Sequence, residues 1–296
     1  MIKQLQELLE RRVDQCVNDK SSPCIKIEKK KELLAKRDAE IVKANAKGKI
    51  VEKSSKVDLS NIHYIVHFQY LIKQKDQFIF EEELEHRIAS FYKGSLMSDQ
   101  ELNVIGQTNK TDINNLAIFN EMVSNYDKTE ERLAFHYDRR KAVQYAERYW
   151  NEYNPQYQKF TDDCTNFISQ CLRAGGAPMR GYPNRSRGWW YQGGTWSYSW
   201  TVAHALKLYL STSKDGLRAK EVKDPRDLLL GDVICYDFQG NGRFDHNTIV
   251  TAKDALGYPL VNAHTTNSRM RYWSYEDSTA YTDQIQYKFY TIVDDN

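Results

Sequence analysis

Residues 163–176 read DCTNFISQCLRAGG, and this stretch decides the fold of the C-terminal half. Thr161, Asp162 and Asp163 are residue types that begin helices, and the glycines at 175–176 are typical of a helix end. Between them, an apolar stripe recurs at helical spacing and consists of Phe167, Ile168, Cys171 and Leu172. The pattern therefore predicts a buried helix with Cys164 in its first turn.

A cysteine in the first turn of a helix has a physical route to reactivity. The helix dipole and the free backbone N–H groups stabilise a thiolate, so we expect them to lower the pKa of Cys164. The same N–H groups are expected to bind an oxyanion that forms beside the sulfur. The alternative for any single buried cysteine is packing in the core, and that alternative describes Cys171 well.

Two histidines follow on a predicted antiparallel meander. Its strands are expected at 233–238, 246–251 and 260–264, separated by glycine-containing turns. In such a meander His246, at the start of one strand, can lie near His264, at the end of the next. A cysteine on a helix start, a histidine on a strand and a polar residue on the adjacent strand form the arrangement of thiol hydrolases.

On these motifs, residues 138–296 resemble the putative amidase domain family of Firmicute proteins, a relative of the NlpC/P60 and CHAP cysteine peptidases of the papain-like superfamily. The motifs are DCTNFISQCLRAGG at 163–176, GDVICYDF at 231–238, DHNTIVT at 245–251 and NAHTTN at 262–267. Asn166 departs from NlpC/P60 proper, which has a small glycine there, and the tyrosine-tryptophan-glycine stretch before the cysteine is missing. The first of these departures, Asn166, indicates a separate branch.

The resemblance implies a papain-like C-terminal domain in which the cysteine-bearing helix packs on an antiparallel sheet. It implies Cys164 as the nucleophile, His246 as the base and His264 as the third, orienting residue. Asn262 and Asn267 are alternative orienting residues. The implied reaction is hydrolysis of a cell-wall peptide amide through a thioester, so the implied partner is a peptide or a peptidoglycan fragment.

An aromatic loop at 188–200 reads GWWYQGGTWSYSW. Aromatic side chains on a loop can stack on sugars or peptide planes, although they can equally cap the core. We expect Trp189 or Trp190 to be exposed, and Trp196 or Trp200 to be buried. The predicted substrate-binding residues are Trp189, Trp190, Trp196, Asp163 and Asn247.

The N-terminal part carries no chemical signature. Helices are predicted at 2–17 and 27–46, and the charged run KIEKKKELLAKR within the second is expected to face solvent. An antiparallel meander is predicted to follow, with strands at 49–58, 64–72 and 78–88. We therefore expect a small α+β domain over 1–125, of the cystatin-like or NTF2-like kind, then a polar linker at 126–137 and the amidase-like domain at 138–296.

Composition limits the classes of partner and cofactor. The 296 residues include 42 Lys and Arg against 40 Asp and Glu, so the net charge of +2 gives no reason to invoke nucleic acid. No apolar run is long enough to span a membrane. The five cysteines contain no Cys-x-x-Cys pair, and Cys16 and Cys24 are expected to be free thiols.

No cofactor and no catalytic metal are predicted. The spacing at 237–245 imitates the first part of a calcium loop, but it lacks the glutamate at the twelfth position, so a tight hairpin is favoured. The start of the chain shows no signal peptide, which indicates a cytoplasmic protein if the chain is complete and an extracellular one if a signal has been removed.

Two rival functions remain open. A cysteine acyltransferase would pass the same thioester to an amine. A non-catalytic module would bind wall glycan through the loop at 188–200 and need no reactive thiol. A third possibility concerns residues 1–125, which can serve as a surface for a protein partner.

Overall fold

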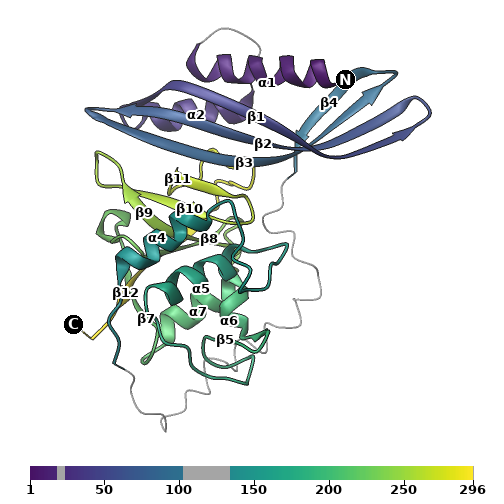
Figure 1. Ribbon diagram of the computed structural model, residues 1–296. Helices are drawn as coiled ribbons and strands as arrows, with labels where there is room; N and C mark the ends of the chain where they lie inside the picture. The colour runs from purple at the N-terminus through teal and green to yellow at the C-terminus, as the bar shows by residue number, and fades with distance from the viewer. Residues whose placement is uncertain (19–23, 103–133, 296) are drawn as a thin grey trace.

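The structure is a computed structural model that describes residues 1–18, 24–102 and 134–295. Its N-terminal elements are α1 (Ile2–Val17), α2 (Ile25–Ala35), β1 (Ala39–Lys56), β2 (Leu59–Gln74), β3 (Gln77–Tyr92) and β4 (Ser95–Glu101). The strands form the predicted antiparallel meander. Every second side chain of β2 from Ile62 to Ile72 is buried, in one core with residues of α1 and α2. Figure 1 shows both helices on the same side of these strands.

The predicted helix over 27–46 is wrong beyond α2, because the chain is already in strand β1 from Ala39 onward. Asp38 has a φ of +53°, a left-handed conformation that cannot continue a right-handed helix. Strand β1 then pairs with β2 over nearly its whole length. This pairing outweighs the helix propensity of the Ala- and Lys-rich segment.

The C-terminal helices are α4 (Arg139–Tyr149), α5 (Cys164–Ala174), α6 (Tyr198–Thr201) and α7 (Ala203–Thr212), with a 3-10 turn at Pro225–Asp227. The strands are β5 (Tyr191–Gln192), β6 (Thr195–Trp196), β7 (Arg218–Val222), β8 (Val233–Asp237), β9 (His246–Lys253), β10 (Pro259–Ala263), β11 (Ser268–Tyr272) and β12 (Gln286–Val293). Helix α5 matches its prediction: Asp163 precedes it, Gly175 follows it, and Gly176 has a φ of +97°.

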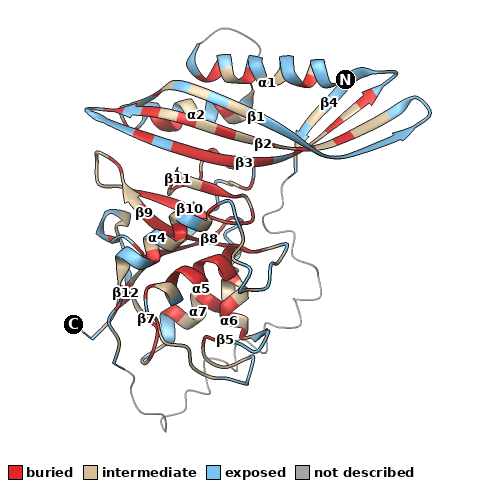
Figure 2. Cartoon of the chain, in the orientation of Figure 1, coloured by how far each residue is buried: buried red, intermediate tan, exposed pale blue. Residues whose placement is uncertain are grey.

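One sheet runs through the molecule and confirms the α+β class. Its ten strands follow the order β1-β2-β3-β11-β10-β9-β8-β12-β7, with β4 paired to β3, and every pairing is antiparallel. The predicted meander of three C-terminal strands corresponds to β8, β9 and β10. Figure 2 shows α5 buried along most of its length beneath these strands.

The two faces of the C-terminal sheet pack against different cores. Side chains alternate between faces along a strand, so neighbours in sequence point in opposite directions. Cys235 and Ile249 belong to the core that contains residues of α5, whereas Ile234 and Val250 belong to a second core around Tyr275. Neighbouring side chains along β9 therefore point into two separate cores.

The predicted N-terminal and C-terminal domains share this sheet. Strand β3 pairs with β11 at Glu83–Ser268 and Glu82–Arg269, and the N–H of Leu84 donates to the carbonyl of Asn267. Leu260 and Tyr272 of the C-terminal part also belong to the N-terminal core. Most of the predicted linker, 126–133, lies outside the described residues, and 134–137 has no regular secondary structure.

The charged run of α2 faces solvent only in part: Glu28, Lys29, Glu32 and Lys36 are exposed, as expected, whereas Lys26, Lys30 and Arg37 are not. The side chain of Lys30 is 4% exposed and that of Lys26 is 10% exposed. Arg37 is also buried, in an ion pair with Asp254. These charges are buried because carboxylates supply partners: Glu85 of β3 for Lys26, Glu81 of β3 and Asp277 for Lys30, and Asp254 for Arg37.

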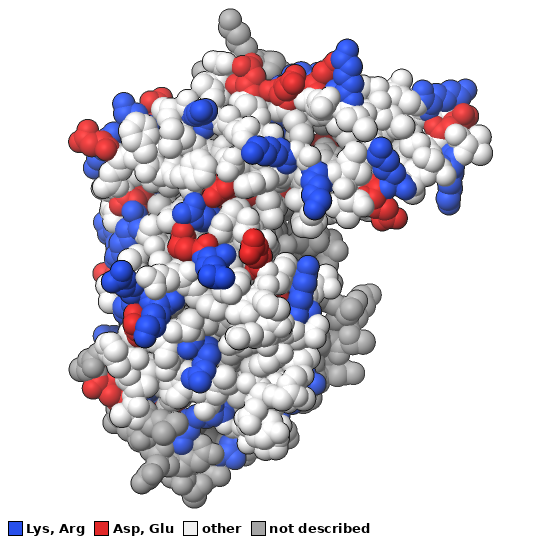
Figure 3. Space-filling view, in the orientation of Figure 1, with Lys and Arg blue, Asp and Glu red and all other residues white. Residues whose placement is uncertain are grey.

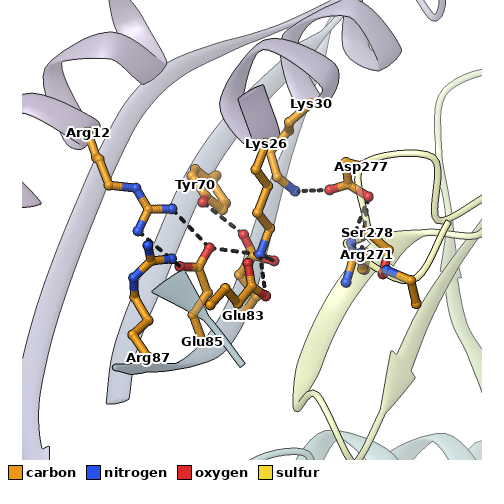
Figure 4. A network of polar contacts seen from close by, with 12 residues as sticks. Arg12, Lys26, Lys30, Tyr70, Glu83, Glu85, Arg87, Arg271, Asp277 and Ser278 are labelled. Atoms are coloured by element: carbon orange, nitrogen blue, oxygen red, sulfur yellow. Dashed lines mark hydrogen bonds and ion pairs between the residues drawn. The ribbon is translucent and has the colours of Figure 1, made fainter. Parts of the chain in front are cut away.

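Glu85 of β3 is the centre of this buried ionic network (Figure 4). Its carboxylate accepts hydrogen bonds from Arg12 of α1 at 3.0 Å, from Lys26 of α2 at 2.7 Å and from Arg87 of its own strand at 2.7 Å. These cations hold the pKa of Glu85 below its usual range despite burial, which alone would raise it. The network thus fixes both N-terminal helices to the sheet.

Lys and Arg are interspersed with Asp and Glu over the face shown in Figure 3. Of the helices that the structure describes, none combines the length and apolar character needed to cross a membrane. All five cysteines, including Cys16 and Cys24, are free thiols.

Replacing Glu85 with alanine tests the network. Glu85→Ala leaves three cations without their shared carboxylate, so we expect a loss of about 3–5 kcal/mol in the free energy of unfolding, measured by urea denaturation. Glu7→Ala is the matched control: Glu7 is exposed and lies 3.9 Å from Lys3, so its removal should change the free energy by less than about 0.5 kcal/mol. Equal stability of the two variants would contradict a role for the network in stability.

Candidate functional site

Cys164 is the first residue of α5, and its side chain is buried where this helix meets the sheet. The sulfur lies 3.7 Å from the hydroxyl of Thr165. The backbone N–H of Asn247 and the hydroxyl of Thr265 are also near the sulfur, and both act to lower its pKa. The sulfur is therefore surrounded by polar groups from α5, from the start of β9 and from the turn after β10.

The thiol is not acidic in this environment, so the predicted lowering of its pKa is wrong. Burial raises the pKa of Cys164 to about 11, although the hydrogen bonds from Thr165, Asn247 and Thr265 act in the opposite direction. Burial raises the pKa of Cys235 and of Cys171 as well. Cys164 is therefore a neutral thiol at pH 7.

Thr265 occupies the first N–H groups of the helix. Its hydroxyl accepts hydrogen bonds from the N–H of Asp163 at 3.0 Å and from the N–H of Cys164 at 3.1 Å. The expectation that the N–H of Cys164 is available to an oxyanion is therefore wrong for this state. Thr265 has a φ of +77°, a conformation that is strained for a β-branched residue and that is found at functional sites.

His246 is the first residue of β9, and its imidazole is fully buried. Its Nε2 lies 3.4 Å from the hydroxyl of Tyr275, while its Nδ1 has no hydrogen-bond partner among the described residues. Burial, together with the positive charge of Arg271, lowers the pKa of His246 to about 3. The imidazole is therefore neutral at pH 7 and carries a free nitrogen.

The sulfur of Cys164 and the side chain of His246 lie on two sides of the peptide group that joins His246 to Asn247. The N–H between His246 and Asn247 contacts the sulfur, and the His246 side chain extends from the same peptide into the core around Tyr275. Within the described residues, no direct hydrogen bond joins the sulfur to a nitrogen of this ring. Burial raises the pKa of Tyr275 to about 12.

The structure does not bring His264 to His246, which corrects the expected orienting role. The Nδ1 of His264 lies 2.8 Å from a carboxylate oxygen of Asp163, and its Nε2 lies 2.7 Å from the carbonyl of Tyr149. Its ring stacks on Phe167 with 4.0 Å between centroids. His264 instead anchors the start of α5 to the end of α4.

The alternative orienting residues are also engaged elsewhere. Asn262 donates to the carboxylate of Glu147 at 2.8 Å and accepts from the hydroxyl of Thr251 at 2.9 Å. Asn267 bonds the side chain of Tyr153. Tyr275, which the sequence analysis did not single out, is the residue that contacts the imidazole of His246.

Asp163 and Asn247 are buried and bonded within the protein, although substrate contact was expected of both. Asp163 accepts from the N–H of Phe160 at 3.0 Å and from Asn166 at 2.9 Å, in addition to His264. Asn247 donates to the hydroxyl of Thr165 at 3.0 Å. Their side chains position the start of the helix.

The expectation that Trp189 or Trp190 is exposed is wrong. Both are buried, as Trp200 is, so neither ring can stack on a substrate in this state. The indole N–H of Trp189 donates to Ser169, which fixes the ring against α5. Trp196 remains half-buried and packs edge-on against Phe160, with 4.8 Å between ring centroids.

No metal cluster of histidine, cysteine or acidic side chains occurs in the described part of the chain. At the calcium-like spacing, the carboxylate of Asp237 instead accepts from the N–H groups of Asn241 at 3.2 Å and Gly242 at 2.7 Å. These bonds close the turn between β8 and β9, and the predicted hairpin is confirmed.

Comparison with known proteins assigns the C-terminal half to a family. The profile of the family described as "Putative amidase domain" matches residues 136–290. The chain belongs to this amidase family. It is 53% identical over 281 residues to "Uncharacterized protein YhbB" of Bacillus subtilis (strain 168), an alignment that covers 91% of this chain and 86% of the relative.

A second relative matches a smaller part of the chain. Over 135 residues the chain is 33% identical to "Uncharacterized protein YjcM" of Bacillus subtilis (strain 168), and this alignment covers 43% of this chain and 30% of the relative. No solved structure matches the chain. The family description places the amidase domain among amide hydrolases in general, and the expected kinship with NlpC/P60 and CHAP peptidases stays a prediction.

Replacing Thr265 tests its contacts in the amidase domain. Thr265→Ala leaves the N–H groups of Asp163 and Cys164 without their shared acceptor, so we expect a loss of about 2 kcal/mol in the free energy of unfolding. Thr265→Ser keeps the hydroxyl and should lose less than half as much. Urea denaturation of both variants measures this difference. An alanine variant as stable as the serine variant would contradict the role of the Thr265 hydroxyl as acceptor for these two N–H groups.

Proposed function

We propose that this protein is a cysteine-dependent amide hydrolase that acts through a thioester on Cys164, with His246 as the base. The observation that carries the proposal is the free Nδ1 of a buried, neutral His246, one peptide away from a thiol on a helix start. A buried polar nitrogen without a partner is costly in a purely structural role. We attribute this unpaired nitrogen to a role as proton acceptor, with the ring approaching the sulfur from the core around Tyr275.

The raised thiol pKa and the lowered imidazole pKa favour general-base catalysis over a preformed ion pair. His246 takes the thiol proton on Nδ1 as the sulfur attacks the amide carbonyl carbon. The imidazolium then gives this proton to the leaving amine, and the carbon–nitrogen bond breaks to leave a thioester. Water, deprotonated by His246, attacks the thioester and releases the carboxylic acid and the thiol.

In this proposal Tyr275 is the orienting residue. Its hydroxyl contacts Nε2 of His246, and in the proposed reaction this hydroxyl accepts from a protonated Nε2, which leaves Nδ1 bare. The substrate carbonyl oxygen competes with the hydroxyl of Thr265 for the N–H of Cys164, because that N–H is already bonded. Substrate binding therefore includes a displacement of the Thr265 side chain.

The proposed substrate class is a cell-wall peptide amide, either within a stem peptide or at the link between sugar and peptide. Support for this class comes from the family resemblance of the sequence motifs. The half-buried pair Phe160 and Trp196 adds a peptide-stacking surface just before the start of α5. A glycan-binding module without catalysis is less favoured, because Trp189 and Trp190 offer no exposed ring.

Replacing Cys164 tests the nucleophile. We expect Cys164→Ala to abolish release of fragments from purified peptidoglycan, followed by mass spectrometry, because the thioester cannot form. Cys171→Ala, the same change seven residues along the same buried helix, should keep activity. Full activity of Cys164→Ala would end the proposal, and products that carry a new amine-derived amide would identify the acyltransferase alternative.

A further inference from the structure

Tyr275 lies in the segment between β11 and β12 and is fully buried. Its φ is +58°, a left-handed conformation that is uncommon for an aromatic residue and that its surroundings must impose. The hydroxyl lies 3.4 Å from Nε2 of His246 and 3.4 Å from the hydroxyl of Ser268. What holds the Tyr275 ring therefore also sets the position of the His246 imidazole.

Arg271 holds this ring. Its guanidinium is fully buried and lies 4.3 Å from the centroid of the Tyr275 ring, a cation–π contact in a site without solvent. The guanidinium donates to Asp277, at 2.8 Å and 3.3 Å to the same carboxylate oxygen. Arg271 and Asp277 thus lie on either side of Tyr275 in sequence and close its segment into a compact turn.

Lys30 of α2 reaches Asp277 from the N-terminal half. Its ammonium lies 2.7 Å from the second carboxylate oxygen of Asp277 and also bonds Glu81 of β3. The two cations, Lys30 and Arg271, hold the pKa of Asp277 far below its usual range, although burial alone would raise it. Figure 4 shows Lys30 and Arg271 on opposite sides of this carboxylate.

The four side chains form a continuous series of contacts from α2 to the base of the proposed site. Lys30 bonds Asp277, Asp277 bonds Arg271, Arg271 contacts Tyr275, and Tyr275 contacts His246. Each charge in the series is buried, so removing one leaves its partner uncompensated and changes the arrangement. The N-terminal half supplies the first of these charges, and the C-terminal half holds the rest.

We propose that α2 is a positioning element of the hydrolase site, because Lys30 fixes the Asp277–Arg271 pair that holds Tyr275 against His246. The inference rests on the proposed function, since it assigns a role toward the base of that reaction. It gives the N-terminal half a part in catalysis that no motif of that half indicates. Lys30, Asp277 and Arg271 are positioning residues, because they act through Tyr275.

The test compares two lysines that reach neighbouring residues of the same segment. Lys30 pairs with buried Asp277, whereas Lys36 pairs with Glu276 at 2.9 Å on the surface, where the Lys36 side chain is 66% exposed. In the full chain acting on purified peptidoglycan, we expect Lys30→Met to lower kcat about 10-fold or more with a smaller change in KM. Lys36→Met should leave both constants unchanged.

Tyr275→Phe tests the other end of the series without disturbing a charge. It removes one hydroxyl, so we expect the fold to persist, kcat to fall by a similar factor, and the 15N signals of the His246 ring to shift. The double variant should be no slower than the slower single variant, because both changes release the same imidazole. Should Lys30→Met fail to fold, Tyr275→Phe and Asp277→Asn provide the same comparison of kcat and ring signals.

Several results would overturn the inference. Folded Lys30→Met with unchanged kcat, or Tyr275→Phe with unchanged kcat and ring signals, removes the link between α2 and the site. Multiplicative losses in the double variant would mean that the two residues act independently. If Cys164→Ala is inactive and Lys30→Met keeps the kcat of the unmodified protein, only this inference is contradicted. If Cys164→Ala is active, the proposed function itself is contradicted.

Discussion

The site depends on the contact between the first turn of α5 and the strands β9 and β10. A helix buried over nine of its residues has N-terminal N–H groups that water cannot reach, and Thr265 satisfies two of them with one hydroxyl. The backbone N–H of Asn247 meets the sulfur of Cys164 from the neighbouring strand. His264 fixes the same turn from the other side through Asp163. Together these bonds hold the thiol next to the peptide that carries His246.

Burial then determines the chemistry. The helix dipole and three hydrogen bonds favour the thiolate, but the desolvation of a fully buried sulfur is the larger effect, and it keeps the thiol neutral. The same effect keeps the imidazole of His246 neutral. Two neutral partners can still react, because proton transfer accompanies attack and the charges form only when the substrate is present.

The sequence predicts those elements of the fold that depend on a local pattern of residues. Caps and a 3.6-residue period specify α5, and a two-residue period with glycine turns specifies the meanders, because these signals lie within one element. It does not predict the burial of Lys30, whose partners Glu81 and Asp277 lie 51 and 247 positions away. Residue types alone also cannot distinguish His264, which anchors a helix, from Tyr275, which contacts His246. Thr265 lies in a quoted motif, but its role depends on a backbone conformation that no residue pattern reveals.

The protonation state of His246 tests the central claim most directly. In protein labelled with 15N in its histidines, the ring signals of His246 report both the charge and the tautomer between pH 4 and 8. The account predicts a neutral ring throughout this range, with the proton on Nε2 toward Tyr275 and a bare Nδ1. An imidazolium at pH 7, or a proton resting on Nδ1, would contradict a base that waits beside a neutral thiol.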